Sequence, residues 1–183
     1  MVVVGSLGLH SKVLTMIDRA ELMVRLKADR QALLDAIEGV PDQALAMPGA
    51  VGTWSAMEVL AHITAWDGET LRRIAFATRQ STRPPHNVDD DAYWLAWNEK
   101  QVEIKQIMGP RGVKVDMAST WVRLLARIEA LSLMDLVRWA EVDPYFFQER
   151  HDLEHAHQLR VWREGWERSL PWWQRLRRKI SEL

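Results

Sequence analysis

Two histidines, His151 and His155, carry the strongest chemical signal in the sequence because they are spaced four residues apart. On an α-helix, residues with this spacing point about 40° apart around the axis, so two imidazoles can reach one metal ion. The paired histidines of metalloprotease helices have the same spacing. By itself the pair also fits chance or helix capping, and a third ligand is needed to favour a metal site.

Three other histidines fall in the expected globular part of the chain. His157 lies two residues after His155, about 200° away around a helix, and is expected on a solvated surface. His86 falls in a proline-rich stretch and is expected to be exposed. His62 lies in a mostly apolar helical stretch, where a neutral imidazole needs a partner. Taken alone, His62 is better explained as a core histidine with a satisfied ring.

The elements that must position these histidines are all predicted to be helices. Apolar spacing and capping residues predict helices over 18–37, 55–78, 89–108, 116–131, 132–139 and 143–168, followed by a terminal helix from Pro171. The glycines and proline at 109–112 are expected to break the chain between two helices. No stretch of useful length alternates with period two, so no strand is expected. We therefore predict an all-α four-helix bundle with additional short helices.

The length and the composition limit the domain organisation and the partners. A chain of 183 residues fits one domain, and we expect a flexible tail over 1–15 and a single bundle domain over 16–183, with Met16 as a candidate start. Lys and Arg number 24 and Asp and Glu 25, so a nucleic-acid partner is not expected. The sequence has no run of 18 apolar residues and no pattern typical of a signal peptide, so no membrane span and a cytoplasmic location are expected.

Two stretches resemble the motifs of the DinB-like superfamily. Residues 52–67 resemble its second-helix motif, with Trp-Ser, an acidic residue, a His followed by an apolar residue, and a later Trp. Residues 151–162 (HDLEHAHQLRVW) resemble its fourth-helix motif, and the details are most similar to the branch that contains the ClbS and DfsB proteins. The resemblance covers about residues 18–168 and is loose over 89–131. It implies a four-helix bundle in which His62, His151 and His155 bind one divalent ion, nickel or zinc.

Other side chains near these motifs are candidates for substrate binding or for support of the ligands: Trp54, Glu58, Trp66, Glu69, Gln158 and Trp162. Gln158 and Trp162 fall within about 40° of the His151 direction on a helix, which predicts one inward face. Glu58 is better explained as part of a capping box with Ser55. Glu69 fits a surface ion pair somewhat better than a role in orienting an imidazole or a metal-bound water. The tryptophans fit a planar or apolar ligand, although a core role is more common.

Three histidine ligands leave open positions on a metal, which is typical of a reactive site. The chain has no cysteine, so a sulfur nucleophile must come from a low-molecular-weight thiol, and the alternative is water activated by the metal. The resemblance implies either thiol transfer to a small electrophile or, as in the ClbS branch, hydrolysis or capture of a strained electrophile that need not use the metal. A non-catalytic stress-response bundle stabilised by its metal is the third hypothesis. The expected partner is a small-molecule substrate, and homodimerisation is left open.

Overall fold

A computed structural model describes residues 18–82, 91–148 and 150–172 of the chain. Within these ranges it contains helices and no strand, which confirms the all-α prediction. The helices are α2 (Arg19–Ile37), α3 (Asp42–Leu45), α4 (Ala56–Ala77), α5 (Asp91–Gln106), α6 (Gly109–Glu129), α7 (Leu133–Val142), α8 (Pro144–Gln148) and α9 (His151–Ser169). The expected tail over 1–15 and most of the expected terminal helix lie outside the described residues.

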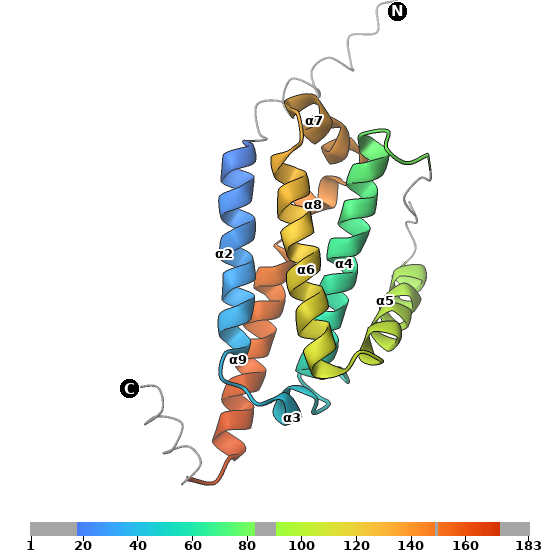
Figure 1. The fold of residues 1–183 in the computed structure, drawn as a ribbon. Helices are drawn as coiled ribbons and strands as arrows, with labels where there is room; N and C mark the ends of the chain where they lie inside the picture. Colours follow the sequence, from blue (N-terminus) through green and yellow to red (C-terminus); the bar gives the residue numbers. More distant parts are fainter. Residues whose placement is uncertain (1–17, 83–90, 149, 173–183) are drawn as a thin grey trace, which may run out of the picture.

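Four long helices, α2, α4, α6 and α9, run side by side as a bundle (Figure 1). α2 packs against α9 and α6, and α4 packs against α6 and α9. α5 lies outside the bundle against α4, while α7 and α8 cover one end and α3 lies at the other (Figure 1). The two sequence motifs are therefore on neighbouring helices, although about ninety residues separate them along the chain.

The predicted caps define the starts of three helices. The Ser55 side chain accepts a hydrogen bond from the Glu58 backbone, and the Glu58 carboxylate accepts one from the Ser55 backbone, which confirms the capping box of α4. Asp18 caps α2 and Ser132 caps α7 in the same way, each through a side-chain oxygen. These interactions span three residues or fewer, so the sequence pattern is sufficient to predict them.

The expected break between two helices is present, but it lies at residues 107 and 108 and not at 109–112. α6 already begins at Gly109 and runs without interruption to Glu129. Gly109 has a φ of 65°, so it supplies the left-handed turn between α5 and α6. Pro110 follows in the first turn of α6, where its missing N–H has no helical partner to lose. The glycine and the proline therefore turn the chain and start α6, and the expected start of this helix at residue 116 is wrong.

The expectation of one continuous helix over 143–168 is also wrong. The chain forms the short α8 after Asp143 and starts a separate helix, α9, at His151. Arg150 has a φ of −114° and a ψ of 60°, which lies outside the helical region. Both metal-ligand candidates of the second motif consequently fall in the first two turns of α9. The short α3, within the segment expected to be a loop, is another element that the sequence did not predict.

The core consists of two groups of buried apolar side chains along the bundle. One group joins α2, α3, α4, α6 and α9, and the other lies toward α7. Trp139 is fully buried in the second group against Phe146 and Phe147. Most other described tryptophans are only partly buried, but Trp54, Trp121, Trp162 and Trp166 pack against these two groups, so the core explanation holds for them in part.

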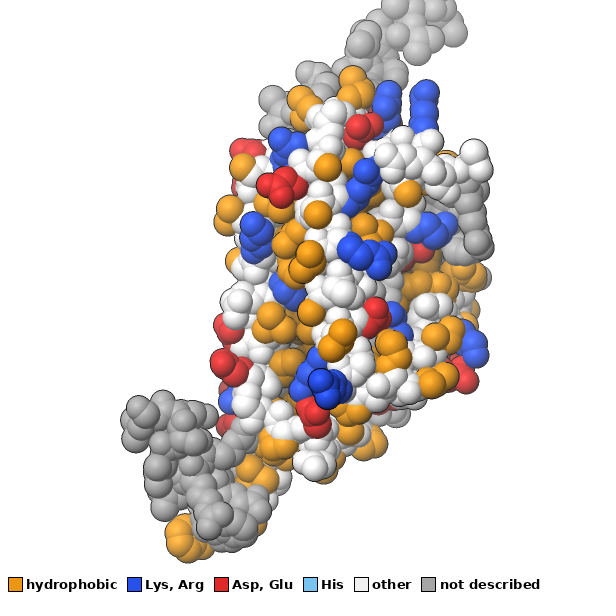
Figure 2. Space-filling view, in the orientation of Figure 1, with side chains coloured by type: hydrophobic (Ala, Val, Ile, Leu, Met, Phe, Trp, Pro, Cys, Tyr) orange, Lys and Arg blue, Asp and Glu red, His pale blue; other side chains and the backbone are white. Residues whose placement is uncertain are grey.

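The surface shows no dominant charge on the face formed by α2 and α6, where acidic and basic side chains are interspersed with apolar ones (Figure 2). This mixture agrees with the formal net charge of −1. None of the helices in the described ranges is both long enough and apolar enough to cross a bilayer.

Candidate metal centre

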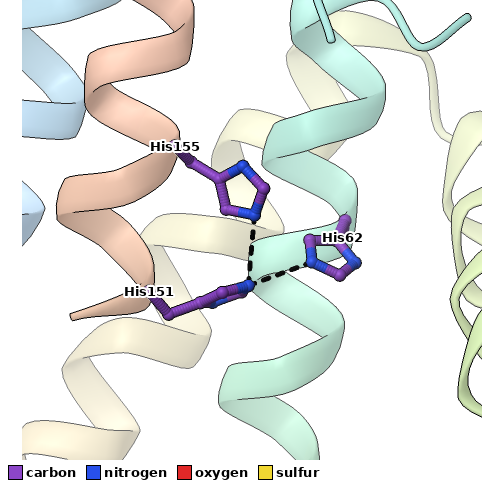
Figure 3. Close-up of side chains that lie close together, drawn as sticks. All are labelled: His62, His151 and His155. Carbon is purple, nitrogen blue, oxygen red and sulfur yellow. Dashed lines mark hydrogen bonds between the residues drawn. The ribbon is translucent and has the colours of Figure 1, made fainter. Parts of the chain in front are cut away.

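Three imidazoles from two helices meet inside the bundle (Figure 3). His62 comes from the second turn of α4, and His151 and His155 come from the first two turns of α9. Nε2 of His151 lies 3.0 Å from Nε2 of His62 and 3.1 Å from Nε2 of His155. The ligand atoms of the three residues all lie within 4.8 Å of one another, so the structure brings together the three histidines that the resemblance of the two motifs implied.

Gln158 orients one of the three rings. Its side-chain oxygen lies 2.8 Å from Nδ1 of His155, one turn earlier on α9. When Nδ1–H donates to this oxygen, the Nε2 of the neutral ring carries a lone pair directed at the cluster. A hydrogen bond of this kind fixes the tautomer and orientation of metal-ligating histidines. Gln158 therefore lies where the sequence placed it, beside a ligand candidate.

Burial keeps the three imidazoles neutral. Burial and the neighbouring charge of His155 lower the pKa of His62 to about 3. Burial is also the largest cause that lowers the pKa of His151 and His155, and His155 adds to the effect on His151. Neutral rings with converging nitrogen atoms can bind a divalent cation without first releasing protons at neutral pH.

The aromatic neighbours divide into two groups. Trp54 and Trp66 lie beside His62, with ring centroids 5.1 Å and 6.4 Å from that of the imidazole. Trp66 also lies 6.3 Å from His151 and donates its indole N–H to Asn98 of α5. Trp162 instead stacks on Trp166. Both Trp54 and Trp162 pack against the core, and neither lines the cavity that adjoins the histidines.

The two acidic candidates have structural roles. Glu58 closes the capping box of α4 and also accepts a hydrogen bond from Gln106 of α5. Glu69 is buried, and both of its oxygens are occupied by Arg72 and Arg73. The ion pair expected for Glu69 is present, although it lies in the interior and not on the surface.

A cavity of about 300 Å³ adjoins the triad and is bordered by His62 and His151. Its size is at the lower end of the range for small-molecule sites. Trp66 and Trp121 form aromatic walls, and Tyr145, an exposed residue of α8, also lines it. The remaining residues that line the cavity are Leu26, Asp29, Arg30, Asp67, Thr70, Asn98, Leu124, Asp143, Phe146, Arg150 and Asp152.

The charged residues that line this cavity were not identified from the sequence, although the position of Arg30 in the sequence indicated its burial. Arg30 lies on the apolar stripe of α2, four residues after Leu26 and three before Leu33, and such a position predicts burial. A buried arginine requires carboxylate partners from other helices. Its partners are Asp67 of α4 and Asp152 of α9. Burial, together with the charge of Asp152, raises the pKa of Asp67 to about 7 despite the opposing effect of Arg30.

A comparison with protein families agrees with the fold and the triad. The family profile described as the DinB superfamily matches residues 25–165, which is more than half of the chain. The chain belongs to the DinB superfamily. The matched residues include α4 and most of α9, and thus all three histidines of the cluster. No significant match to the chain was found among curated proteins or among solved structures.

Proposed function

We propose that this DinB protein binds one divalent ion, zinc or nickel, through His62, His151 and His155, and acts on a small electrophilic substrate. The observation that carries the proposal is the convergence of three neutral imidazole nitrogens beside a cavity. Without a cation, the two short contacts cannot both be full hydrogen bonds, because they share the single Nε2 of His151 and a neutral ring nitrogen either donates one hydrogen or accepts one. The donor set suits zinc and nickel, both of which accept imidazole ligands.

The chain supplies three neutral ligands and, through Gln158, the orientation of one of them. A divalent ion held by these three residues would supply Lewis acidity to a bound substrate or water. The aromatic walls of Trp66 and Trp121 bind and orient an apolar or planar part of the substrate and exclude water from it.

The nucleophile in this proposal comes from solution. The chain contains no cysteine, so thiol transfer requires a low-molecular-weight thiol as a second substrate, and hydrolysis requires water. Membership of the ClbS/DfsB branch is part of the proposal and rests on the details of the two sequence motifs. Thiol transfer and hydrolysis are both compatible with a cavity that borders two of the three ligands.

The first experiment is metal analysis of protein purified without a chelating tag and dialysed against zinc or nickel. We expect about one ion per chain in the wild type and a strong loss in His62→Ala, His151→Ala and His155→Ala, because each removes one ligand. His157→Ala is the matched control, since His157 is exposed on the same helix and does not belong to the cluster. A wild-type protein that takes up neither ion would contradict the metal site.

Turnover is then measured with an epoxide or an activated aryl halide, with and without an added thiol and before and after chelation. Thiol-dependent, metal-dependent turnover supports transfer, and metal-dependent turnover without thiol supports hydrolysis. Turnover that survives chelation supports the metal-independent reaction of the ClbS type. A metal-loaded protein that turns over neither probe supports the non-catalytic binding bundle.

A further inference from the structure

The N-terminus of α9 is only weakly stabilised by its own residues. Its first residue is His151, one of the three ligand candidates, and no side chain caps its N-terminus. The first turn of a helix lacks intrahelical partners for its N–H groups and frays readily. A ligand at this position therefore needs to be held from outside its own helix.

Two consecutive residues of α2 hold the two residues that flank His151. The carboxylate of Asp29 accepts two hydrogen bonds from Arg150, including one of 3.0 Å from Nε. Nε of Arg30 donates to the Asp152 carboxylate at 2.6 Å. In one ion pair the residue of α2 is the acid, and in the other it is the base. The two pairs therefore define which residue of α2 faces Arg150 and which faces Asp152.

Arg30 also binds the helix that carries His62. Its Nη2 donates to both carboxylate oxygens of Asp67, at 3.0 Å and 2.9 Å, and Asp67 lies five residues after His62 on α4. The Arg30 side chain is only 4% exposed, and its guanidinium carbon lies 4.1 Å from the ring centroid of Trp121 on α6. One guanidinium of α2 thus contacts each of the other three helices of the bundle.

We infer that Arg30, supported by Asp29, positions His151 relative to His62 and so sets the geometry of the metal site. The inference rests on the proposed function, because it concerns the same three ligands. The planar fork of arginine presents separate donors to Asp67 and Asp152, whereas a lysine offers a single nitrogen and cannot hold both carboxylates in this arrangement. Arg30 is a positioning residue, since it acts through the helices and not through contact with the metal.

The test measures Co²⁺ and Zn²⁺ affinity and the visible absorption spectrum of the Co²⁺ form. We expect Arg30→Lys to weaken both affinities by about 10- to 100-fold, the usual effect of losing a group that supports a metal ligand. The Co²⁺ spectrum should also change, because His151 no longer holds its position. Arg150→Gln should weaken binding in the same direction, and Arg150→Lys, which keeps the pair with Asp29, should restore it.

Arg73→Lys is the matched control. Arg73 is a buried arginine that binds two carboxylates, Glu69 and Asp143, but neither lies on α9. This variant should lose stability while keeping the wild-type affinity and Co²⁺ spectrum, which separates positioning from a general structural role. Circular dichroism verifies that each variant is folded before metal is added.

Each outcome decides the inference. Wild-type affinity and spectrum in Arg30→Lys, or an equal loss in Arg73→Lys, would overturn it while leaving the proposed metal site intact. If Arg30→Lys fails to fold, the half-exposed Arg150 decides, and unchanged binding in Arg150→Gln overturns the inference. A wild-type protein that binds neither ion contradicts the proposed function itself, and this inference with it.

Discussion

The position of one proton determines whether His155 can act as a ligand. Only the neutral ring with hydrogen on Nδ1 directs a lone pair from Nε2 toward His151 and His62, and the Gln158 oxygen stabilises this tautomer. His155 and Gln158 lie three residues apart on α9, within one turn of the helix. Their contact therefore depends little on the rest of the bundle. The importance of Gln158 can therefore be tested by a single substitution.

Gln158→Leu should weaken zinc affinity by about 10- to 100-fold, because the acceptor for the His155 N–H is lost. Gln158→Glu keeps an acceptor oxygen at the same place and should stay close to the wild type. The measurement is a competition titration with a chromogenic chelator. Gln31→Leu, on the exposed face of α2, is the control, and an equal loss there would argue against a specific role.

At the scale of elements, the two helices that carry the ligands begin in different ways. α4 starts with a complete capping box formed by its own residues, whereas α9 starts without a side-chain cap and depends on α2. His62 lies in the second turn of α4, so the capping box stabilises the segment that presents it. Local and long-range interactions thus share the positioning of the triad.

Ser55→Ala should lower the free energy of unfolding by about 1 kcal/mol, because the Glu58 N–H loses its acceptor. Urea denaturation of the chelator-treated protein measures the change. Ser119→Ala, an exposed position in α6, removes a hydroxyl that caps no helix and should change stability by less than about 0.5 kcal/mol. Equal effects of the two substitutions would contradict the structural role of the cap.

At the scale of the whole molecule, burial of three neutral histidines couples folding to pH. The pKa values of these histidines are lowered in the folded protein, while an unfolded histidine titrates near pH 6.5. Their contribution to stability is complete above about pH 6.5 and is lost as the pH falls, because the unfolded chain takes up protons first. Asp67 acts in the opposite direction, since its raised pKa favours the folded state as the pH falls toward its unfolded value.

The contribution of His62 can be isolated by comparing the wild type with His62→Gln in metal-free form. Between about pH 6.5 and 5, the stability of the wild type should fall more steeply, by up to about 1.4 kcal/mol per pH unit, which corresponds to one proton. The effect of Asp67 is common to both proteins and largely cancels. Urea denaturation across this range gives the two slopes, and identical slopes would show that His62 titrates normally in the folded protein.

Much of the site was predictable because its strongest signals are local. The four-residue spacing of His151 and His155, the capping box of Ser55 and Glu58, and the helical pattern each depend on residues within about one turn. His62 was paired with the other two through the resemblance of its motif, and helical spacing alone left it as a core histidine. The family profile supports that resemblance at the level of the DinB superfamily.

By itself, the sequence determined the all-α character of the described residues, the caps and the face shared by His151, His155 and Gln158, since short-range geometry is enough for each. Only the tertiary structure decided that α8 ends before a separate α9, that His62 meets the pair, and that Arg30 joins Asp67 to Asp152. The last two of these features depend on contacts between residues 37 to 122 positions apart. Such contacts form only when four helices pack together, and no local spacing encodes which buried charge of one helix meets which carboxylate of another.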